Sequence, residues 1–212
     1  HHNHQTTDID VPDLVSRFLA AKQASGVSAA YLRDLRNRTR TFCAFHGGRV
    51  SDLTQQNMVH YFGTLNFEAT NHNNQLRVIR TLVNFAKSQG FLPETIDLLK
   101  AVATKKERKP SYPIYQPAQF EALLDGATVE MIPPLALLGF CGVRPNEMRR
   151  LHWRDVRFES RTLIIDAVNA KTAMRRTVPL CEGALMWLRP YKGSEGPIWG
   201  RKSDFWSKAL NR

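Results

Sequence analysis

The stretch that decides the fold of this chain reads Gly142-Val143-Arg144-Pro145-Asn146-Glu147-Met148-Arg149-Arg150-Leu151-His152-Trp153-Arg154-Asp155-Val156. An apolar segment, residues 131–141, precedes it and ends at Gly142. Pro145 suits the first position of a helix, because its missing N–H would have no partner there. The pattern therefore predicts that Arg144 lies at a helix N-terminus, where free backbone N–H groups and the helix dipole favour an anion.

Glu147 is the residue best placed to orient the side chain of Arg144. It lies three residues on, in the first turn of the predicted helix. Met148 and Leu151 are spaced i, i+3 and are predicted to face inward, whereas the two arginines between them face solvent. An arginine held in this way can grip a phosphate with two parallel hydrogen bonds. The alternative is an ordinary surface arginine that caps a turn.

The longer pattern Gly-Val-Arg-x-x-Glu-Met-x-x-Leu-x-Trp-x-Asp-Val closely resembles the first arginine box of the tyrosine recombinases, the phage integrase family. Downstream, Ala170-Lys171-Thr172 and Arg176-x-Val178-Pro179-Leu180 resemble the hairpin lysine and closing strand of that family. The resemblance covers nearly the whole chain. It implies a mainly α fold with a small antiparallel β-sheet: a helical-bundle core-binding domain (residues 1–103), a basic linker (104–116) and a partial α+β catalytic domain (117–212).

The composition is strongly basic. The formal net charge of the 212 residues is +11, with +3 in residues 1–103 and +8 in residues 104–212. Such a balance indicates a polyanionic partner, but alone it does not separate DNA from RNA or an acidic membrane surface. Three scattered cysteines fit neither a disulfide framework nor a zinc site. Reduced thiols fit a cytoplasmic, nucleoid-associated protein best, and no apolar run reaches the ~18 residues of a membrane span.

Residues 10–103 are predicted to form helices. Predicted helix starts are Asp10, Ser28, Thr54 and about Asn71, and a short fifth helix is expected after Pro93. The expected inward residues are Leu14, Val15, Phe18, Leu19, Leu32, Leu35, Thr39, Phe42, Phe45, Met58, Tyr61, Phe62, Leu65, Leu76, Ile79, Leu82, Val83 and Ala86. A small helical bundle follows from this pattern.

Basic residues form stripes on the two longest predicted helices and are dense in the linker. The DNA-contacting candidates are Arg33, Arg36 and Arg40 on the second helix, Arg77, Arg80 and Lys87 with Asn73 and Asn84 on the fourth, and Lys105, Lys106, Arg108 and Lys109 in the linker. A solvated helix face is the alternative for each stripe. Two stripes in a basic protein favour contacts with the DNA backbone. The resemblance implies that the linker lets two domains close round the duplex.

The second domain is predicted to begin with a helix at Pro117, with Phe120, Leu123 and Leu124 inward. A buried helix over residues 131–141 leads to Arg144. Strands are then expected around Val156–Phe158, over 162–165 and over 176–180, with a polar hairpin tip at 167–174 that carries Lys171. Pro179 indicates an edge strand or a strand end. Two further helices are expected around residues 184–188 and 204–211, the latter with Phe205, Trp206 and Leu210 as its apolar surface.

The resemblance also implies a reaction. A tyrosine attacks a DNA phosphodiester, leaves a 3′-phosphotyrosyl bond and a free 5′-hydroxyl, and the reverse step joins a new strand. By resemblance Arg144 stabilises the charged transition state, Glu147 is the acidic residue beside it, and Lys171 protonates the departing 5′-oxygen. Arg175 and Arg176, next to the hairpin, are further candidates for DNA contacts. We expect no cofactor, no metal, no small-molecule substrate and no membrane partner, but double-stranded DNA and, in a complete protein, other protomers in a tetramer on paired sites.

The family's later boxes, a His-x-x-Arg and the nucleophilic tyrosine, do not occur before Arg212. His46-Gly47-Gly48-Arg49 has the right letters in the wrong domain, and Tyr191 comes too early to be the nucleophile. Whether the chain is an enzyme therefore stays open. One reading is a fragment of a site-specific recombinase from a mobile element. Another is a naturally truncated, non-catalytic protein that occupies recombination sites. A type IB topoisomerase is disfavoured by the compact helical N-terminal domain and short linker.

Overall fold

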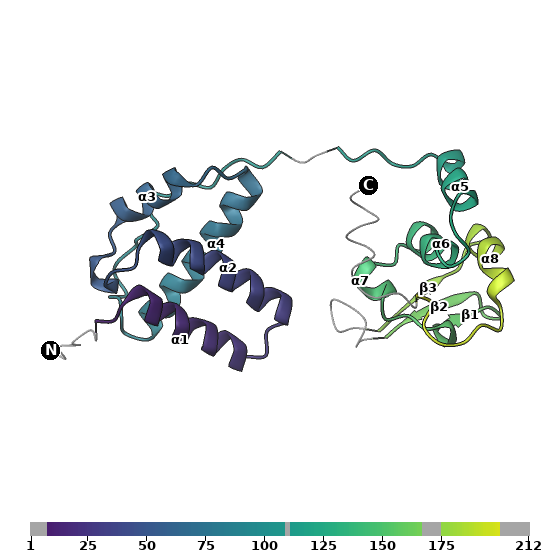
Figure 1. Cartoon of the computed structure of the whole chain (residues 1–212), viewed down its shortest axis with the longest axis horizontal. Coiled ribbons are helices and arrows are strands. Elements are labelled where there is room, and N and C mark those ends of the chain that lie inside the picture. The colour runs from purple at the N-terminus through teal and green to yellow at the C-terminus, as the bar shows by residue number, and fades with distance from the viewer. Residues whose placement is uncertain (1–7, 109–110, 167–174, 200–212) are drawn as a thin grey trace. The chain divides into compact units, whose positions relative to one another are not determined.

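The computed structural model of this protein describes residues 8–108, 111–166 and 175–199. The chain divides into two compact units, His1–Ser111 (unit 1) and Tyr112–Arg212 (unit 2). Each unit has a hydrophobic core of its own, and Figure 1 shows helices alone in unit 1 and helices with a small sheet in unit 2. The fold class predicted from the sequence, mainly α with a small antiparallel sheet, is confirmed.

Unit 1 is a helical bundle. Its elements are α1 (Val11–Ala24), α2 (Ala29–Phe45), the 3-10 helix η1 (Val50–Asp52), α3 (Gln55–Thr64) and α4 (Ala69–Ser88). The caps follow the sequence: Ser28 Oγ accepts from the backbone N–H of Tyr31 at 3.2 Å, and Thr54 forms a reciprocal capping box with Asn57. Asp10 occupies the N-cap position of α1, but its side chain makes no capping bond and lies 3.6 Å from Arg49.

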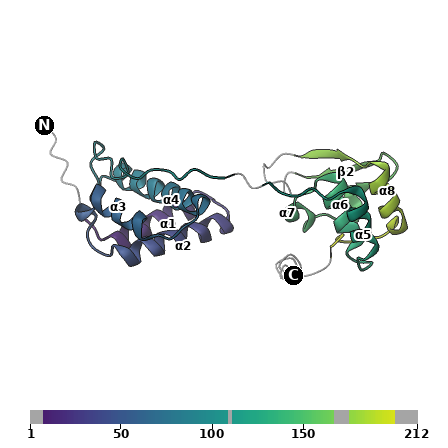
Figure 2. The ribbon, with the colours of Figure 1, turned by 90° about the horizontal axis from the view of Figure 1, so that it is seen from above.

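The core of unit 1 contains nearly all the residues that helical periodicity placed inside, with Phe18, Phe42, Tyr61 and Ile79 almost fully buried. Phe45 is an exception: it is the last residue of α2 and 38% of it is exposed, although its ring packs against Tyr61 and His60. Figure 2 shows α1, α2 and α4 running side by side through this bundle.

The short helix predicted after Pro93 is wrong. Residues 93–102 form turns that close one end of the bundle. Leu98, Leu99 and Val102 are buried there without any helix, because a chain of turns can also point three apolar side chains at a core.

Unit 2 alternates short helices with three strands. Its elements are α5 (Pro117–Asp125), α6 (Ile132–Cys141), α7 (Pro145–Met148), η2 (Trp153–Asp155), β1 (Val156–Arg157), β2 (Thr162–Ile165), β3 (Arg176–Pro179), α8 (Glu182–Leu188) and η3 (Arg189–Tyr191). Their order agrees with the predicted one. The predicted hairpin tip at 167–174 and the predicted last helix at 204–211 lie outside the described residues.

The three strands form an antiparallel sheet in the order β1-β2-β3. Leu163 pairs with Val156 on one side and Val178 on the other, and its side chain is buried. Pro179 ends β3 at the edge of the sheet, opposite Thr162, where its missing N–H costs no ladder bond. The prediction made from this proline is confirmed.

The core of unit 2 lies between the sheet, α6 and α8, and includes Leu137, Met148, Leu163 and Leu185. Leu123, predicted to face inward, is 38% exposed, because α5 turns only Leu124 fully into the core. Within the described residues, no helix combines the length and apolar character needed to cross a membrane.

Candidate functional site

The junction between α6 and α7 places Arg144. Gly142 ends α6 with a φ of 59°, a left-handed conformation that a glycine adopts without a steric penalty. Arg144 is then the N-cap of α7, and Pro145 its first residue, as predicted. However, α7 is a single turn of four residues, and the backbone N–H of Arg144 donates to Glu147 Oε2 at 2.9 Å. The expected anion site of free N–H groups and a helix dipole is therefore wrong for this turn.

Glu147 is the centre of the site. Its side chain is 1% exposed, and each of its two carboxylate oxygens accepts two hydrogen bonds. Arg144 donates from its backbone N–H to Oε2 and from Nη1 to Oε1, both at 2.9 Å. Arg176 donates from Nη1 to Oε1 and from Nη2 to Oε2, both at 2.7 Å, in the parallel geometry of a bidentate pair. The carboxylate thus has its hydrogen-bonding capacity filled.

These contacts change the acidity of Glu147. The hydrogen bonds from Arg176, and then those from the backbone and side chain of Arg144, lower the pKa of Glu147 to about 2, although burial acts in the opposite direction. Glu147 is therefore ionised throughout the physiological pH range. A buried carboxylate without these partners would tend to be protonated.

We expect acid to destabilise unit 2 through this group. Because the pKa of Glu147 falls from an ordinary 4.5 to about 2 on folding, its stabilisation is complete above pH 4.5 and is lost as the pH falls towards 2. The shift corresponds to about 3 kcal/mol of unfolding free energy. Urea unfolding between pH 6 and pH 2.5 should show a flatter pH dependence for Glu147→Gln than for the wild-type chain. Parallel pH profiles of the two proteins would contradict this prediction.

Arg144 keeps most of its guanidinium available. Only Nη1 takes part in the pair with Glu147, and 53% of the side chain is exposed. Nε and Nη2 take no part in that pair and lie on one edge of the planar group. Two donors on one edge match the two oxygens of a phosphate. Lys171, the third predicted catalytic residue, lies outside the described residues.

Arg175 and Arg176 were grouped together as DNA contacts, but the structure gives them different surroundings. Arg175 is 65% exposed and lies 3.4 Å from the exposed Asp166. Arg176 is 33% exposed and is bound to the buried Glu147. Sequence reasoning singled out Arg176 within the Arg-x-Val-Pro-Leu segment but missed this partner, since the two residues stand 29 positions apart.

Tyr191 has a structural environment. Its ring stacks on Trp153 with centroids 5.7 Å apart, and its hydroxyl donates to the carbonyl of Val129 at 2.7 Å. Burial raises the pKa of the Tyr191 hydroxyl. A hydroxyl that is engaged and harder to ionise is poorly suited to attack a phosphate. This environment agrees with the reasoning that excluded Tyr191 as the nucleophile.

The basic stripes of unit 1 are largely solvent-exposed. Arg33, Arg36 and Arg40 all lie on the exposed side of α2, and Arg77 and Arg80 on that of α4. Two members of the second stripe have local partners: Arg77 donates to Asn74 at 2.8 Å, and the half-buried Lys87 donates to the carbonyl of Glu94 at 3.0 Å. The α2 stripe therefore offers its charges more freely than the α4 stripe.

The first part of the linker is bound to α4, which sequence reasoning did not foresee. The side-chain amide of Asn73 pairs with the backbone of Lys105 in both directions, each at 2.9 Å, and also donates to Glu107 at 2.8 Å. His72 contacts the carbonyl of Ala103 at 3.1 Å. The Lys105 ammonium donates to the carbonyl of Phe67 at 2.9 Å, so its charge is partly engaged within unit 1. Residues 103–107 are thus held against the beginning of α4, and the described cations of the linker, Lys105, Lys106 and Arg108, are all exposed.

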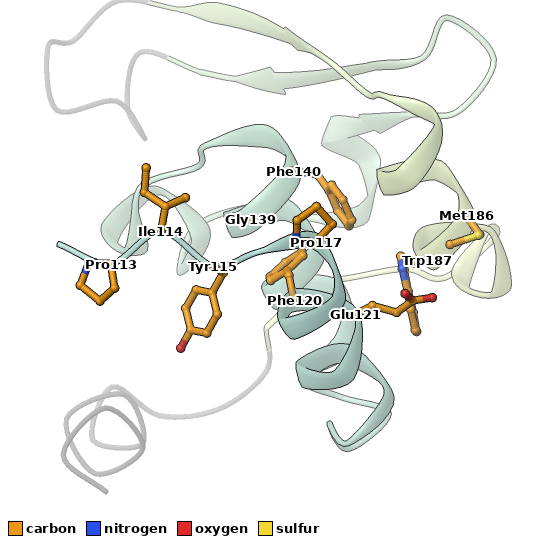
Figure 3. A pocket seen from close by; sticks show the side chains of 10 residues that line it. All are labelled: Pro113, Ile114, Tyr115, Pro117, Phe120, Glu121, Gly139, Phe140, Met186 and Trp187. Carbon is orange, nitrogen blue, oxygen red and sulfur yellow. The ribbon is translucent and has the colours of Figure 1, made fainter.

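An apolar groove of about 630 Å³ also lies on unit 2 (Figure 3). Phe120 crosses its floor against Gly139, where any Cβ would overlap the ring, and Tyr115, Phe140 and Trp187 also line it. The charged residue among those lining it is the acidic Glu121. A groove of this chemistry repels phosphate, so the candidate anion site is the cluster of Arg144, Glu147 and Arg176.

Comparison with known proteins identifies the type of fold. The sequence model of the phage integrase family matches residues 119–204. No curated protein matches the chain in sequence. Among solved structures, a lambda integrase tetramer bound to a Holliday junction superimposes with a TM-score of 0.77 at 15% identity, over 96% of this chain and 65% of that one.

Two further structures give the same result. A lambda integrase dimer bound to a COC′ core site has a TM-score of 0.73 at 11% identity, over 92% of this chain and 58% of that one. The Tn1549 transposon integrase in complex with a circular intermediate DNA has a TM-score of 0.63 at 17% identity, over 88% of this chain and 66% of that one. The chain therefore spans 58% to 66% of the length of these three proteins.

Proposed function

We propose that this chain is a DNA-binding fragment of a site-specific recombinase of the phage integrase family of tyrosine recombinases. The complete protein would break and rejoin DNA strands through a 3′-phosphotyrosyl intermediate. The observation that carries this proposal is Arg144, an exposed arginine fixed by a buried carboxylate, with two donors free of that pair. The match of the family model to the surrounding residues 119–204 supports it.

The proposed chemistry follows from the charge that develops at phosphorus. Attack by a tyrosine turns the diester into a pentavalent phosphorane with more negative charge on its oxygens than the ground state. A cation that is already held in position needs no reorganisation during the reaction, and it stabilises the phosphorane more than it stabilises the substrate diester. Arg144 would supply this cation, Glu147 would hold it in position, and Lys171 would protonate the 5′-oxygen that leaves. The bond energy is kept in the covalent intermediate, so this route uses no nucleotide cofactor.

We further propose that residues 1–103 form a core-binding domain, that residues 104–116 link it to the partial catalytic domain, and that both domains contact duplex DNA. The exposed stripes of α2 and α4 would lie along phosphates, and so would Lys105, Lys106, Arg108 and Lys109 of the linker between the two domains. Other protomers of the complete recombinase are the expected protein partners. The lambda integrase dimer and tetramer structures with DNA support this proposal.

The contribution of the α2 stripe can be tested with one charge at a time. Arg36→Gln removes an exposed cation from the stripe, and Lys100→Gln removes an exposed cation of unit 1 that lies off both stripes. If Arg36 contacts a phosphate, its loss should reduce the slope of log K against log salt by about 0.9. Fluorescence anisotropy with a labelled duplex over a range of salt concentrations measures both slopes.

Lys100→Gln is the matched control because it changes the net charge by the same amount. Its slope should stay within the error of the wild-type value. Equal reductions for the two variants would mean that only net charge matters, and the assignment of α2 to the DNA interface would fail.

A further inference from the structure

We propose that Arg176 is a positioning residue that keeps the charge of Arg144 available to a phosphate, and that it acts through the buried carboxylate of Glu147. This inference rests on the proposed function, because it assigns a role at the same site. Under this proposal, Arg176 does not itself contact the DNA. Its two donors, Nη1 and Nη2, are both committed to Glu147 at 2.7 Å.

The first step concerns charge. The cluster holds two cations, Arg144 and Arg176, and one anion, Glu147, so that its net charge is positive. If Arg176 were replaced by an uncharged residue, an ionised Glu147 beside Arg144 would form a pair with no net charge. A phosphate would then meet the buried carboxylate as well as the guanidinium. Because Glu147 is 1% exposed, water screens this repulsion poorly.

The second step concerns geometry. Arg176 donates one hydrogen bond to each oxygen of Glu147, which leaves one further acceptor position on each oxygen. Arg144 fills these positions with Nη1 and its backbone N–H. Arg144 is therefore held by one guanidinium nitrogen and does not form a bidentate pair of its own. Without Arg176, both oxygens would be open to a second donor of Arg144, and its phosphate-binding edge would turn towards Glu147.

The third step concerns the place of Arg176 in the fold. It begins β3, opposite Ile165 of β2, and it stands five residues after Lys171 in the sequence. Its bond to Glu147 joins the strand that follows the predicted catalytic lysine to the turn that carries the predicted catalytic arginine. The neighbouring Arg175 has no such link, since it pairs with the exposed Asp166.

The test is a set of variants of the full chain whose affinity for a labelled duplex is measured at one low salt concentration. Arg144→Ala should weaken binding about 10-fold, the usual effect of losing a charged hydrogen bond. Arg176→Ala should weaken it by a similar factor. Combining the two should add little, because Arg176 acts through Arg144. Arg176→Ala combined with Glu147→Gln should recover binding to within about 3-fold of wild type. The double variant has no carboxylate beside Arg144, so the positive charge of Arg144 is no longer balanced by a neighbouring anion.

Arg189→Ala is the matched control, since it removes the same charge from an exposed arginine of unit 2 that pairs with the exposed Glu182, outside the cluster. Its loss of affinity gives the part of any effect that comes from net charge alone. Thermal unfolding of each variant measures stability separately. Should Arg176→Ala alone fail to fold, the double variant with Glu147→Gln, which no longer buries a carboxylate, decides the question by its affinity.

Two outcomes would overturn the inference. If Arg176→Ala and Arg144→Ala weaken binding by factors that multiply, Arg176 contacts the DNA independently. If Glu147→Gln fails to restore the affinity of Arg176→Ala, the carboxylate is not the intermediary. Failure of the proposed function looks different: Arg144→Ala would then leave the affinity unchanged, whatever Arg176 does.

Discussion

Binding of this chain to duplex DNA should weaken by about 10³–10⁵-fold when the salt concentration rises from roughly 50 to 200 mM, if the two units together contact 6–10 phosphates. The physical reason is counterion release: each cation that replaces a condensed counterion at a phosphate adds to the salt dependence. The chain has a formal net charge of +11, enough for such a footprint. Titration of a labelled duplex at several salt concentrations gives the slope directly.

The structure sharpens the expected count of phosphate contacts. Lys105 is less available than its sequence position implies, because its ammonium donates to the carbonyl of Phe67. Arg77 and Lys87 also have partners within unit 1. We therefore expect a salt dependence that corresponds to the lower half of the range of roughly 6–10 phosphate contacts. The main contributors from unit 1 should be Arg33, Arg36 and Arg40.

Truncation gives the control for this prediction. A chain of residues 1–111 keeps the core of unit 1 and the contacts of Asn73 with residues 105 and 107. If both units hold the duplex, this shorter chain should bind more weakly and with a smaller slope. A flat salt response of the full chain, or equal binding by residues 1–111, would exclude a clamp made by two units.

The sequence predicted the surroundings of Arg144 well because they depend on local chemistry. Gly142 ends a helix through its left-handed backbone, and Pro145 starts the next turn because it needs no donor there. Met148 and Leu151 are fully buried, as their spacing predicted. These effects act within a few residues, so one sequence is enough to predict them. The length of α7 was less predictable, because packing and not periodicity ends it after one turn.

Contacts between distant segments could not be predicted in the same way. The pair of Arg176 with Glu147 depends on how the fold brings the start of β3 to the turn of α7, and that follows from the packing of the whole unit. The bonds of Asn73 to residues 105 and 107 depend on the path of the chain after α4. From the sequence alone, an asparagine such as Asn73 on a basic helix face is equally consistent with a DNA contact and with a bond to another part of the chain. Polar side chains with several possible partners are decided by tertiary structure, whereas buried apolar residues are largely decided by spacing.

In a complete recombinase that contains this chain, Arg144→Ala should slow strand cleavage by about 10²–10³-fold, the usual cost of removing one donor that stabilises a developing oxyanion. The structure favours an effect on the transition state over one on folding, since 53% of the Arg144 side chain is exposed and Glu147 keeps its bidentate partner Arg176. Single-turnover cleavage of a nicked duplex measures the rate, and thermal unfolding of the same variant measures stability. A rate loss that merely follows a loss of folded protein would contradict this role.

Lys171→Ala should fail at a different point of the same reaction, and the substrate can reveal which. If Lys171 protonates the departing 5′-oxygen, a duplex with sulfur in place of that oxygen should restore the cleavage rate of Lys171→Ala, because a thiolate leaves without a proton. The same duplex should not restore Arg144→Ala, since the charge on the phosphorane oxygens still lacks its cation. Rescue of both variants would show that the substrate is simply more reactive. Rescue of neither would remove the general-acid role of Lys171 and leave Arg144 as the supported catalytic group of this chain.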